Sequence, residues 1–596
     1  METDAGKSAW RGALLTASAA LAACAPAWLI LRYGVDVPYW DHWDLAPFFE
    51  RLARGTLTAA DLFAQQNEYR QFFPNLLFVA LGRLTGWNVR AEMLACLLLA
   101  CAAALGVRSL AARTSADPSG GRAGTGGVQF LLASLFIFSA VQYENWLFGV
   151  QVVYFVPGAC VTAGLVSAYS ERLGARASVF VCACLAAVAT FSSANGVVCW
   201  LVLPLAILAA RPEARASARR WLPLWGACLG LCLAAYVYGY HTPKGHPAPS
   251  EAVTRPVDAL IYLSALSGGP LALGPRPLPV AVAAGACALA AYAFACAYLL
   301  RHRNDAALVR RAGAWVALGA YSVVTAAMVT AGRLGFGVAQ SLSSRYTTFT
   351  LYLLVALVYL LPCVAWHAAR RGRGLASRAA LLRRLGAAAA VLLVLAHVAA
   401  FVLVVKHGAA PTRRARLRAK ACLLFVEAAP NERCLAEGLH PNVPKLRARA
   451  AALDRLGYLR PPLVKDGRMK ALAPDGFVCS DAYGEFVLAR STSGDVITAG
   501  SARLPHRRGE PADAIVLAHG SGEDDQTAFA LAAVERGETM GAKADDESTH
   551  WVKMFPPAAL PSGVVGGWFT AWAFDAEEGK AYRLCGGGSL PPAGVR

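Results

Sequence analysis

Two aspartates near the start of the chain have the residue type and spacing for acid–base chemistry. They belong to the hexapeptide 39–44 (YWDHWD), a polar stretch just beyond the first apolar segment. In a helix, a spacing of three residues puts Asp41 and Asp44 on one face. Trp40 and Trp43 would wall a pocket there and limit water, which raises the pKa of a carboxylate toward a value useful for a base. The alternative is that both tryptophans anchor the chain at a membrane interface and both aspartates are solvated.

We assign Asp41 as the general base, because aromatic side chains flank it. Asp44 would then position an acceptor or a cation, so a divalent cation is an open possibility. The reverse assignment of the two aspartates also stays open.

Composition indicates a polytopic membrane protein. Of the 596 residues, 56% are hydrophobic and 16% are charged, and the mean hydropathy is +0.43. A soluble domain could not bury so much apolar surface. The net charge of +19 comes largely from arginines in short connections between apolar segments. This placement indicates membrane topology and not a nucleic-acid partner.

Apolar length predicts about eleven transmembrane helices. The first continues past Cys24, so we read it as an uncleaved span and not as a lipoprotein signal. The predicted spans are 12–32, 91–111, 128–141, 150–168, two within 178–210, 221–240, 278–300, 312–331, 346–368 and 385–406. The apolar stretch 71–86 is read as an interfacial or re-entrant helix.

Arginines occupy alternate connections, on the same side as Lys7 and Arg11. The connections that carry them are 113–122, 172–176, 211–220, 301–311 and 370–384. The positive-inside rule therefore predicts a cytoplasmic N-terminus, and residues 407–596 outside the cytoplasm.

The chain is expected to have three parts. Residues 1–406 form the transmembrane domain, with a long first outer loop at 33–90. Residues 407–465 form a helical stem, and 466–596 form a small all-β domain, a sandwich or jelly roll, because short alternating runs are separated by Gly, Pro, Asp and Ser. The four cysteines outside the predicted spans would pair in an oxidising compartment as Cys422–Cys434 and Cys479–Cys585.

The polar residues that can do chemistry gather in the predicted outer loops. Glu68 and Glu144 can orient an acceptor or hold a cation. Arg333 and Arg345 can pair with a phosphate near the bilayer surface, or simply snorkel as anchors. The remaining candidates for substrate binding are Arg70, Asn145, Asn195 and Tyr346. His241 and His246 lie in a proline-rich loop without a third ligand at metal spacing, so no metal site is assigned.

The architecture of residues 1–406 resembles the GT-C membrane glycosyltransferases, which include the protein O-mannosyltransferases and the aminoarabinose transferases of lipid A. The resemblance rests on Asp41 and Asp44 in the first outer loop and on the stretch 72–90. In addition, the stretches 332–337 (GRLGFG) and 344–346 (SRY) are similar to bacterial membrane proteins of this general build. The resemblance to the GT-C glycosyltransferases implies a bacterial inner-membrane enzyme with a polyprenyl-phosphate-linked sugar as donor. The acceptor would be a glycan, a lipid or a protein, the base an aspartate of the first loop, and the anomeric carbon would be inverted. The Asp-x-x-Asp spacing departs from a plain Asp-x-Asp motif or an adjacent pair of acids.

Three other functions fit parts of the sequence. A glycolipid transporter or flippase would carry polar groups at mid-membrane depth, whereas here they lie at the outer ends. An O-acyltransferase would need a histidine base, for which His42 is the candidate. An envelope assembly protein would act through its β domain. That domain could bind glycan or a partner, or be a folded periplasmic cap with its own core, and Trp568 and Trp572 fit either interpretation.

Overall fold

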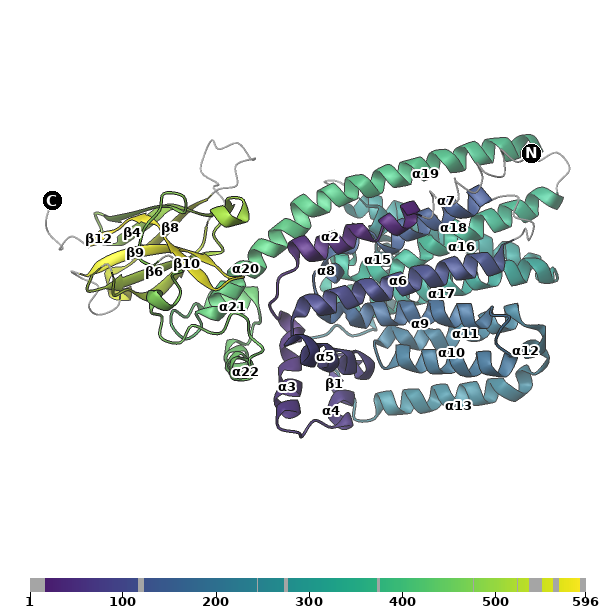
Figure 1. Ribbon diagram of the computed structural model, residues 1–596. Coiled ribbons are helices and arrows are strands. Elements are labelled where there is room, and N and C mark those ends of the chain that lie inside the picture. The colour runs from purple at the N-terminus through teal and green to yellow at the C-terminus, as the bar shows by residue number, and fades with distance from the viewer. Residues whose placement is uncertain are drawn as a thin grey trace. The chain divides into compact units, whose positions relative to one another are not determined.

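The computed structural model describes residues 17–115, 123–243, 245–272, 277–371, 376–474, 476–522, 524–534, 549–560 and 567–589. It divides into two compact units (Figure 1). The first unit comprises Met1–Gly34, Thr58–Ala80 and Arg90–Ala409, and the second comprises Val35–Leu57, Leu81–Val89 and Ala410–Arg596. The hexapeptide therefore groups with the C-terminal part of the chain, whereas the sequence-based division placed it with the membrane helices.

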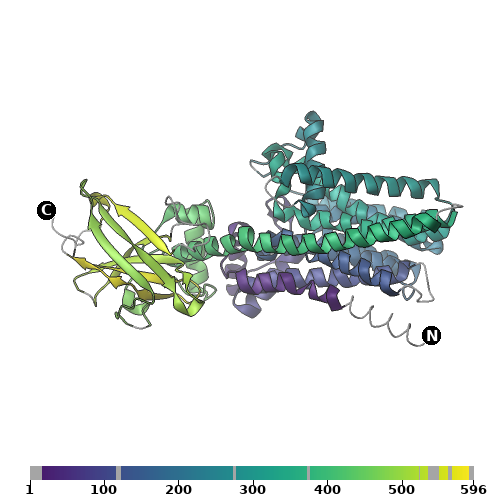
Figure 2. The same ribbon diagram turned by 90° about the horizontal axis from the view of Figure 1, so that it is seen from above.

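The first unit is a bundle of near-parallel helices (Figure 1, Figure 2). Within the described residues, eight helical spans are long and apolar enough to cross a membrane. They are Val89–Thr114, Gly126–Trp146, Gly149–Ala168, Ala218–Val237, Pro277–Arg301, Ala306–Phe336, Ser344–Arg371 and Gly386–Leu424. Each overlaps a predicted span, and the last extends beyond residue 406 into the predicted stem. The other three predicted spans coincide with shorter apolar helices, Ala17–Tyr33, Ala175–Thr190 and Ala194–Ala210. The chain is thus a multi-pass membrane protein by the length and composition of its helices, and the count of eleven spans stays a prediction.

The helices of this unit have the following bounds: α2 (Cys24–Tyr33), α4 (Ala59–Phe63), α5 (Phe72–Thr85), α6 (Val89–Thr114), α7 (Ala123–Ile137), α8 (Tyr143–Trp146), α9 (Val152–Ala168), α10 (Ala175–Thr190), α11 (Cys199–Ala210), α12 (Pro212–Ala216), α13 (Ala218–Val237), α14 (Glu251–Thr254), α15 (Pro256–Gly268), α16 (Pro277–Arg301), α17 (Ala306–Arg333), α18 (Thr347–Arg371) and α19 (Ala376–Val404). Local signals set several starts. Asp305 caps α17 by accepting a hydrogen bond from the Leu308 amide at 3.0 Å, and a proline opens both α15 and α16.

Sequence reasoning treated α15 as part of a loop. This 13-residue helix packs closely on α16 through glycines. A Cβ at Gly268 would lie 2.0 Å from the carbonyl oxygen of Ala281, and one at Gly285 would lie 1.8 Å from that of Ser264. Only glycine permits this approach of two backbones, which is the kind of contact that membrane helices use.

Arginines from alternate connections meet at one end of the bundle. Arg211 donates to the carbonyl oxygens of Ala168 at 2.8 Å and Leu173 at 2.9 Å, and Arg310 pairs with Glu171 at 3.4 Å. These contacts bring together residues in or next to the arginine-bearing connections 172–176, 211–220 and 301–311. Which side of a membrane this end faces stays a prediction.

The second unit contains the stem and the β domain. The helices of this unit are η1 (Trp40–Leu45), α3 (Ala46–Ala53), α20 (Ala410–Leu424), α21 (Glu432–Gly438) and α22 (Val443–Arg455). The ring of Phe49 lies 4.7 Å from that of Trp87 and 4.8 Å from that of Tyr458. Burial of these aromatic rings explains why 35–57 and 81–89 group with the stem and not with the membrane helices.

The β domain consists of two five-stranded sheets that share one core (Figure 1). One sheet has the order β10-β9-β6-β7 with β12 on β9, and the other has the order β11-β3-β4-β5 with β8 on β4. The strands are β3 (Gly484–Arg490), β4 (Val496–Leu504), β5 (Glu510–Pro511), β6 (Ala514–Gly520), β7 (Thr527–Ala532), β8 (His550–Phe555), β9 (Trp568–Asp575), β10 (Lys580–Arg583), β11 (Cys585–Gly586) and β12 (Gly588–Ser589). The core includes Phe486, Ile515, Trp551 and Phe569. The β-rich C-terminal part is therefore present, and a jelly-roll topology stays a prediction.

Two disulfides lie in the second unit. The structure links Cys422 to Cys434 and Cys479 to Cys585, the same pairs that the sequence predicts. The first joins α20 to α21, and the second joins the segment before β3 to β11.

Candidate functional site

Residues 40–44 of the hexapeptide lie in the short 3₁₀ helix η1, which ends at Leu45, and Tyr39 precedes it in an extended conformation. The first residue of η1, Trp40, has a φ of 47° and donates its backbone N–H to the carbonyl oxygen of Leu439 at 2.8 Å. Trp40 is 45% exposed, whereas Trp43 is fully buried. The two indoles therefore have different surroundings, and Trp43 is part of the packing of this unit.

The two aspartates differ in the same way. Asp41 is exposed. The Asp44 carboxylate is paired with Arg449 at 2.5 Å and with Lys445 at 2.8 Å, both on α22. Burial alone would raise the pKa of Asp44, but the hydrogen bonds from Lys445 and Arg449 hold it below its usual range. A carboxylate with a lowered pKa is a weak base, and one that already contacts two cationic groups does not suit a divalent metal ion.

A second cluster of charged side chains lies in the first unit. Glu68 sits at the tip of the hairpin formed by β1 (Gln65–Gln66) and β2 (Tyr69–Arg70). Its Oε2 accepts a hydrogen bond from Nη2 of Arg333 at 2.6 Å, and its Oε1 pairs with Nδ1 of His246. Arg333 and His246 are also in contact, with Nη1 and Nδ1 2.7 Å apart. We call Glu68, His246 and Arg333 the carboxylate–arginine cluster.

The cluster is largely shielded from water. The side chains of Arg333, His246 and Glu68 are 13%, 19% and 23% exposed. Charged hydrogen bonds strengthen as solvent is excluded, so this arrangement can hold an anionic group firmly if one displaces Glu68. It lies at the C-terminal end of α17, at the opposite end of that helix from Arg310.

The hairpin that carries Glu68 is held in place by its own neighbours. Arg70 donates from Nε to the carbonyl oxygen of Tyr236 at 2.7 Å, from Nη1 to that of Phe63 at 3.1 Å, and from Nη2 to that of Tyr238. Because all three guanidinium nitrogens donate to backbone carbonyls, Arg70 positions the hairpin. The substrate-binding role expected for Arg70 from the sequence stays a prediction.

Three tyrosines surround the cluster. Tyr69 follows Glu68 in the hairpin and is hydrogen-bonded to Tyr154, and both lie close enough to Tyr346 for electrostatic interaction. Burial, and then the negative charge of Glu68, raise the pKa of Tyr69, so its phenol is neutral and can donate a hydrogen bond. Tyr154 and Tyr346 are buried.

Arg345 lies beside Tyr346, with its guanidinium 5.8 Å from the centre of that ring. Its Nε donates to Oγ of Ser343 at 3.1 Å and lies 3.9 Å from Oε2 of Glu144. The side chains of Arg345 and Glu144 are 50% and 39% exposed, so this pair is weak and open to solvent. Arg345, unlike Arg333, is available to a ligand without displacing a buried partner.

Asn145 and Asn195, which the sequence suggested as binding residues, are both buried. Nδ2 of Asn145 donates to the carbonyl oxygen of Arg345 at 2.9 Å and to Oγ1 of Thr348 at 2.6 Å. Nδ2 of Asn195 donates to Oη of Tyr321 at 2.9 Å. Asn145 therefore positions the backbone that carries Arg345, and Asn195 joins two helices of the bundle.

The structure thus separates the predicted site residues into two groups. Glu68, Arg333 and Tyr346 come together in the first unit, with Arg345 and Glu144 next to them, and the Asp41–Asp44 pair belongs to the second. The sequence marked His246 only as a possible metal ligand. Tyr69 and Tyr154 are not among the predicted site residues. Tyr69 could have been selected because it lies between the candidates Glu68 and Arg70 in the sequence. No sequence neighbour of Tyr154 points to a role for that residue.

Comparisons of this chain with family models, with curated proteins and with solved structures found no match.

Proposed function

We propose that this protein is a membrane glycosyltransferase that moves a sugar from a polyprenyl-phosphate-linked donor to an acceptor hydroxyl. The observation that carries the proposal is the carboxylate–arginine cluster. A shielded arginine at the end of a membrane-spanning helix, with tyrosine side chains around it, suits the phosphate of a lipid whose chain remains in the bilayer.

In this proposal Glu68 holds Arg333 in position until the donor binds. Two oxygens of the donor phosphate then replace the Glu68 carboxylate on the guanidinium of Arg333. A planar guanidinium can bind phosphate through two parallel hydrogen bonds. Tyr69 donates a hydrogen bond to the same group, and Arg345 supplies a second positive charge. Displaced Glu68 remains next to His246, whose ring N–H can donate a hydrogen bond to the carboxylate.

The catalytic base is not part of the carboxylate–arginine cluster, and Asp41 stays the proposal for that role on the sequence argument alone. Asp41 takes the proton from an acceptor hydroxyl, and the oxygen forms a bond to the anomeric carbon. The bond between that carbon and the donor phosphate oxygen breaks, with inversion, and polyprenyl phosphate leaves. The lowered pKa of Asp44 supports this choice between the two aspartates, whereas the exposure of Asp41 does not fit the expected shielding of its carboxylate by the tryptophans. No step is assigned to a divalent cation.

The test compares two variants of the cluster with a control variant, Arg310→Lys, near the other end of α17. Membranes containing Arg333→Lys or Glu68→Gln are supplied with polyprenyl-phosphate-linked radioactive hexoses and pentoses, and the transferred label is measured. We expect Arg333→Lys to lower transfer at least tenfold, because a point charge cannot replace two charge-assisted hydrogen bonds of about 1.5–3 kcal/mol each. Arg310→Lys, in the exposed pair with Glu171, should leave transfer unchanged.

Two results would contradict the proposal. One is transfer at background level with every donor in the wild-type protein. The other is movement of intact donor across the membrane without cleavage of the sugar–phosphate bond, which would show a transporter.

A further inference from the structure

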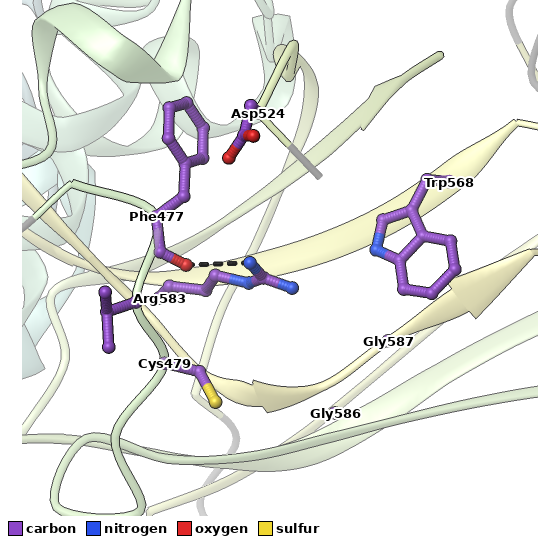
Figure 3. Close-up of a pocket in the computed structure, with 8 residues that line it drawn as sticks. Phe477, Cys479, Asp524, Trp568, Arg583, Gly586 and Gly587 are labelled. Carbon is purple, nitrogen blue, oxygen red and sulfur yellow. Dashed lines mark hydrogen bonds between the residues drawn. The ribbon is translucent and has the colours of Figure 1, made fainter. Parts of the chain in front are cut away.

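A cavity of about 600 Å³ lies in the β domain, far along the chain from the residues considered so far. Small-ligand sites usually have volumes of about 300–1,000 Å³. The cavity is lined by Phe477, Val478, Cys479, Asp524, Trp568, Arg583, Gly586 and Gly587 (Figure 3).

Strand alternation places two of the lining residues on one face of the sheet. Alternate residues of β9, such as Phe569, enter the core between the sheets, so Trp568 and Trp572 lie on the opposite face. Arg583 of β10 pairs in register with Trp572 and shares that face. Phe477, from the segment before β3, packs edge-on against Trp572 with ring centres 5.6 Å apart. Aromatic rings and a guanidinium are thus fixed around one hollow.

Glycines form another wall. Gly586 and Gly587 have φ values of 104° and 123°, which other residues rarely adopt. A Cβ at Gly586 would lie 2.1 Å from the carbonyl oxygen of Phe486, and one at Gly587 would lie 2.6 Å from that of Phe569. Side chains are excluded here, so the wall presents bare backbone to the cavity. The disulfide between Cys479 and Cys585 joins this wall to the segment that carries Phe477.

The polar groups of the cavity point inward. Arg583 is only 8% exposed, and its Nη1 donates to the carbonyl oxygen of Phe477 at 2.7 Å. Figure 3 shows its guanidinium directed across the cavity toward the indole of Trp568. Among the described residues, Nε1 of Trp568 is buried and has no hydrogen-bond partner. Asp524 is exposed at the rim and offers a carboxylate acceptor.

This combination of groups favours one class of ligand. The flat faces of Trp568 and Phe477 suit the apolar face of a pyranose ring. The guanidinium of Arg583 suits a planar carboxylate, and the indole N–H can donate to the same group or to a hydroxyl. Asp524 can accept hydrogen bonds from sugar hydroxyls. We propose that this cavity binds an acidic saccharide, a glycan segment with a carboxylate-bearing sugar. The proposal concerns binding alone and does not depend on the transferase reaction.

The test uses the full-length protein in nanodiscs and isothermal titration calorimetry. The probes are trigalacturonate, the neutral trisaccharide maltotriose, and inorganic phosphate. We expect trigalacturonate to bind at least tenfold more tightly than maltotriose, and phosphate to compete only weakly. Arg583→Gln and Trp568→Ala should each weaken trigalacturonate binding about tenfold or more, the scale of one charge-assisted hydrogen bond. Arg503→Gln, at an exposed position of β4 outside the cavity lining, should not change it.

Arg583 is buried, so Arg583→Gln is checked by circular dichroism and thermal unfolding. If that variant unfolds, Trp568→Phe and Asp524→Asn decide, because the first keeps an apolar ring but removes the N–H and the second alters an exposed group. No binding of trigalacturonate would overturn the proposal. So would equal binding of maltotriose, equal competition by phosphate, or unchanged binding in the Trp568 and Asp524 variants.

Discussion

Replacing Asp44 with Asn should loosen the hexapeptide from α22. The Asp44 carboxylate contacts Arg449 at 2.5 Å and Lys445 at 2.8 Å, and its side chain is 36% exposed. The substitution keeps the size of the side chain and removes one charge. Arg449, which is only 17% exposed, would then lose its anionic partner at that position.

The magnitude follows from exposure. Fully exposed ion pairs contribute about 0.2–1 kcal/mol, and hydrogen bonds to charged groups about 1.5–3 kcal/mol. More than a third of the Asp44 side chain faces solvent, so screening reduces the larger figure, and we expect about 1–2 kcal/mol for both contacts together. This corresponds to an opening equilibrium that is about 5–30-fold more favourable.

Hydrogen–deuterium exchange with mass spectrometry measures this opening in the full-length protein. The backbone N–H of Trp40, which donates to Leu439, is the direct probe, within peptides that cover 36–46. Exchange there should become about 5–30-fold faster in Asp44→Asn. Arg447→Gln is the matched control, because Arg447 lies on the same helix but pairs with Glu432, whose side chain is 75% exposed.

The effect should also depend on pH in a defined direction. The pKa of Asp44 is lower in the folded protein than in the unfolded chain. Its stabilisation is therefore fully present above the unfolded pKa of about 3.9 and is lost as the pH falls through the folded value. After correction for intrinsic exchange rates, wild type and variant should converge as the pH is lowered below about 4. Equal exchange at pH 7 in the Asp44 and Arg447 variants would refute the reasoning.

Three further predictions concern other parts of the chain. Cys422→Ser should lower the free energy of unfolding of the stem by about 3 kcal/mol, since the bridge to Cys434 closes a short loop, and mass spectrometry of unreduced peptides should show both bridges; free thiols at all four positions would contradict this. Reporter fusions after residue 304 and at the C-terminus should give opposite signals, and equal signals would refute the alternation of arginines as a guide to topology. Asp41→Asn should lower sugar transfer about 10²-fold or more while donor binding persists, and near-normal transfer would remove Asp41 from the proposed chemistry.

The long helices were predictable because a span needs about 20 apolar residues, and composition alone reports that. Helix α15 was not predictable, because its 13 residues are too few for a membrane span. Its contact with α16 depends on Gly268 and Gly285, and the sequence does not distinguish these glycines from others. The participation of Cys422, Cys434, Cys479 and Cys585 in disulfides was predictable from their location outside apolar spans, but location alone does not choose among the three pairings that four cysteines allow.

The candidate site was predictable only in part. Residue type was enough to select Glu68 and Arg333, but their contact joins positions 265 residues apart. The spacing of Asp41 and Asp44 predicted a catalytic role for the hexapeptide. In the structure, however, Trp43 is buried while Trp40 is exposed, and Asp44 contacts Arg449, 405 residues later in the chain. Such long-range pairings depend on tertiary packing, which local patterns do not encode.

The bridge between Cys479 and Cys585 has a mechanical consequence for the β domain. It joins positions 106 residues apart, one before the first strand of the domain, β3, and one after its eighth strand, β10. A pulling force applied between the stem and the C-terminal end of the chain would pass through the covalent bridge. The strands from β3 to β10 would then carry little tension, so an oxidised domain should keep its sheets, and its cavity wall, under loads that would unravel the reduced one.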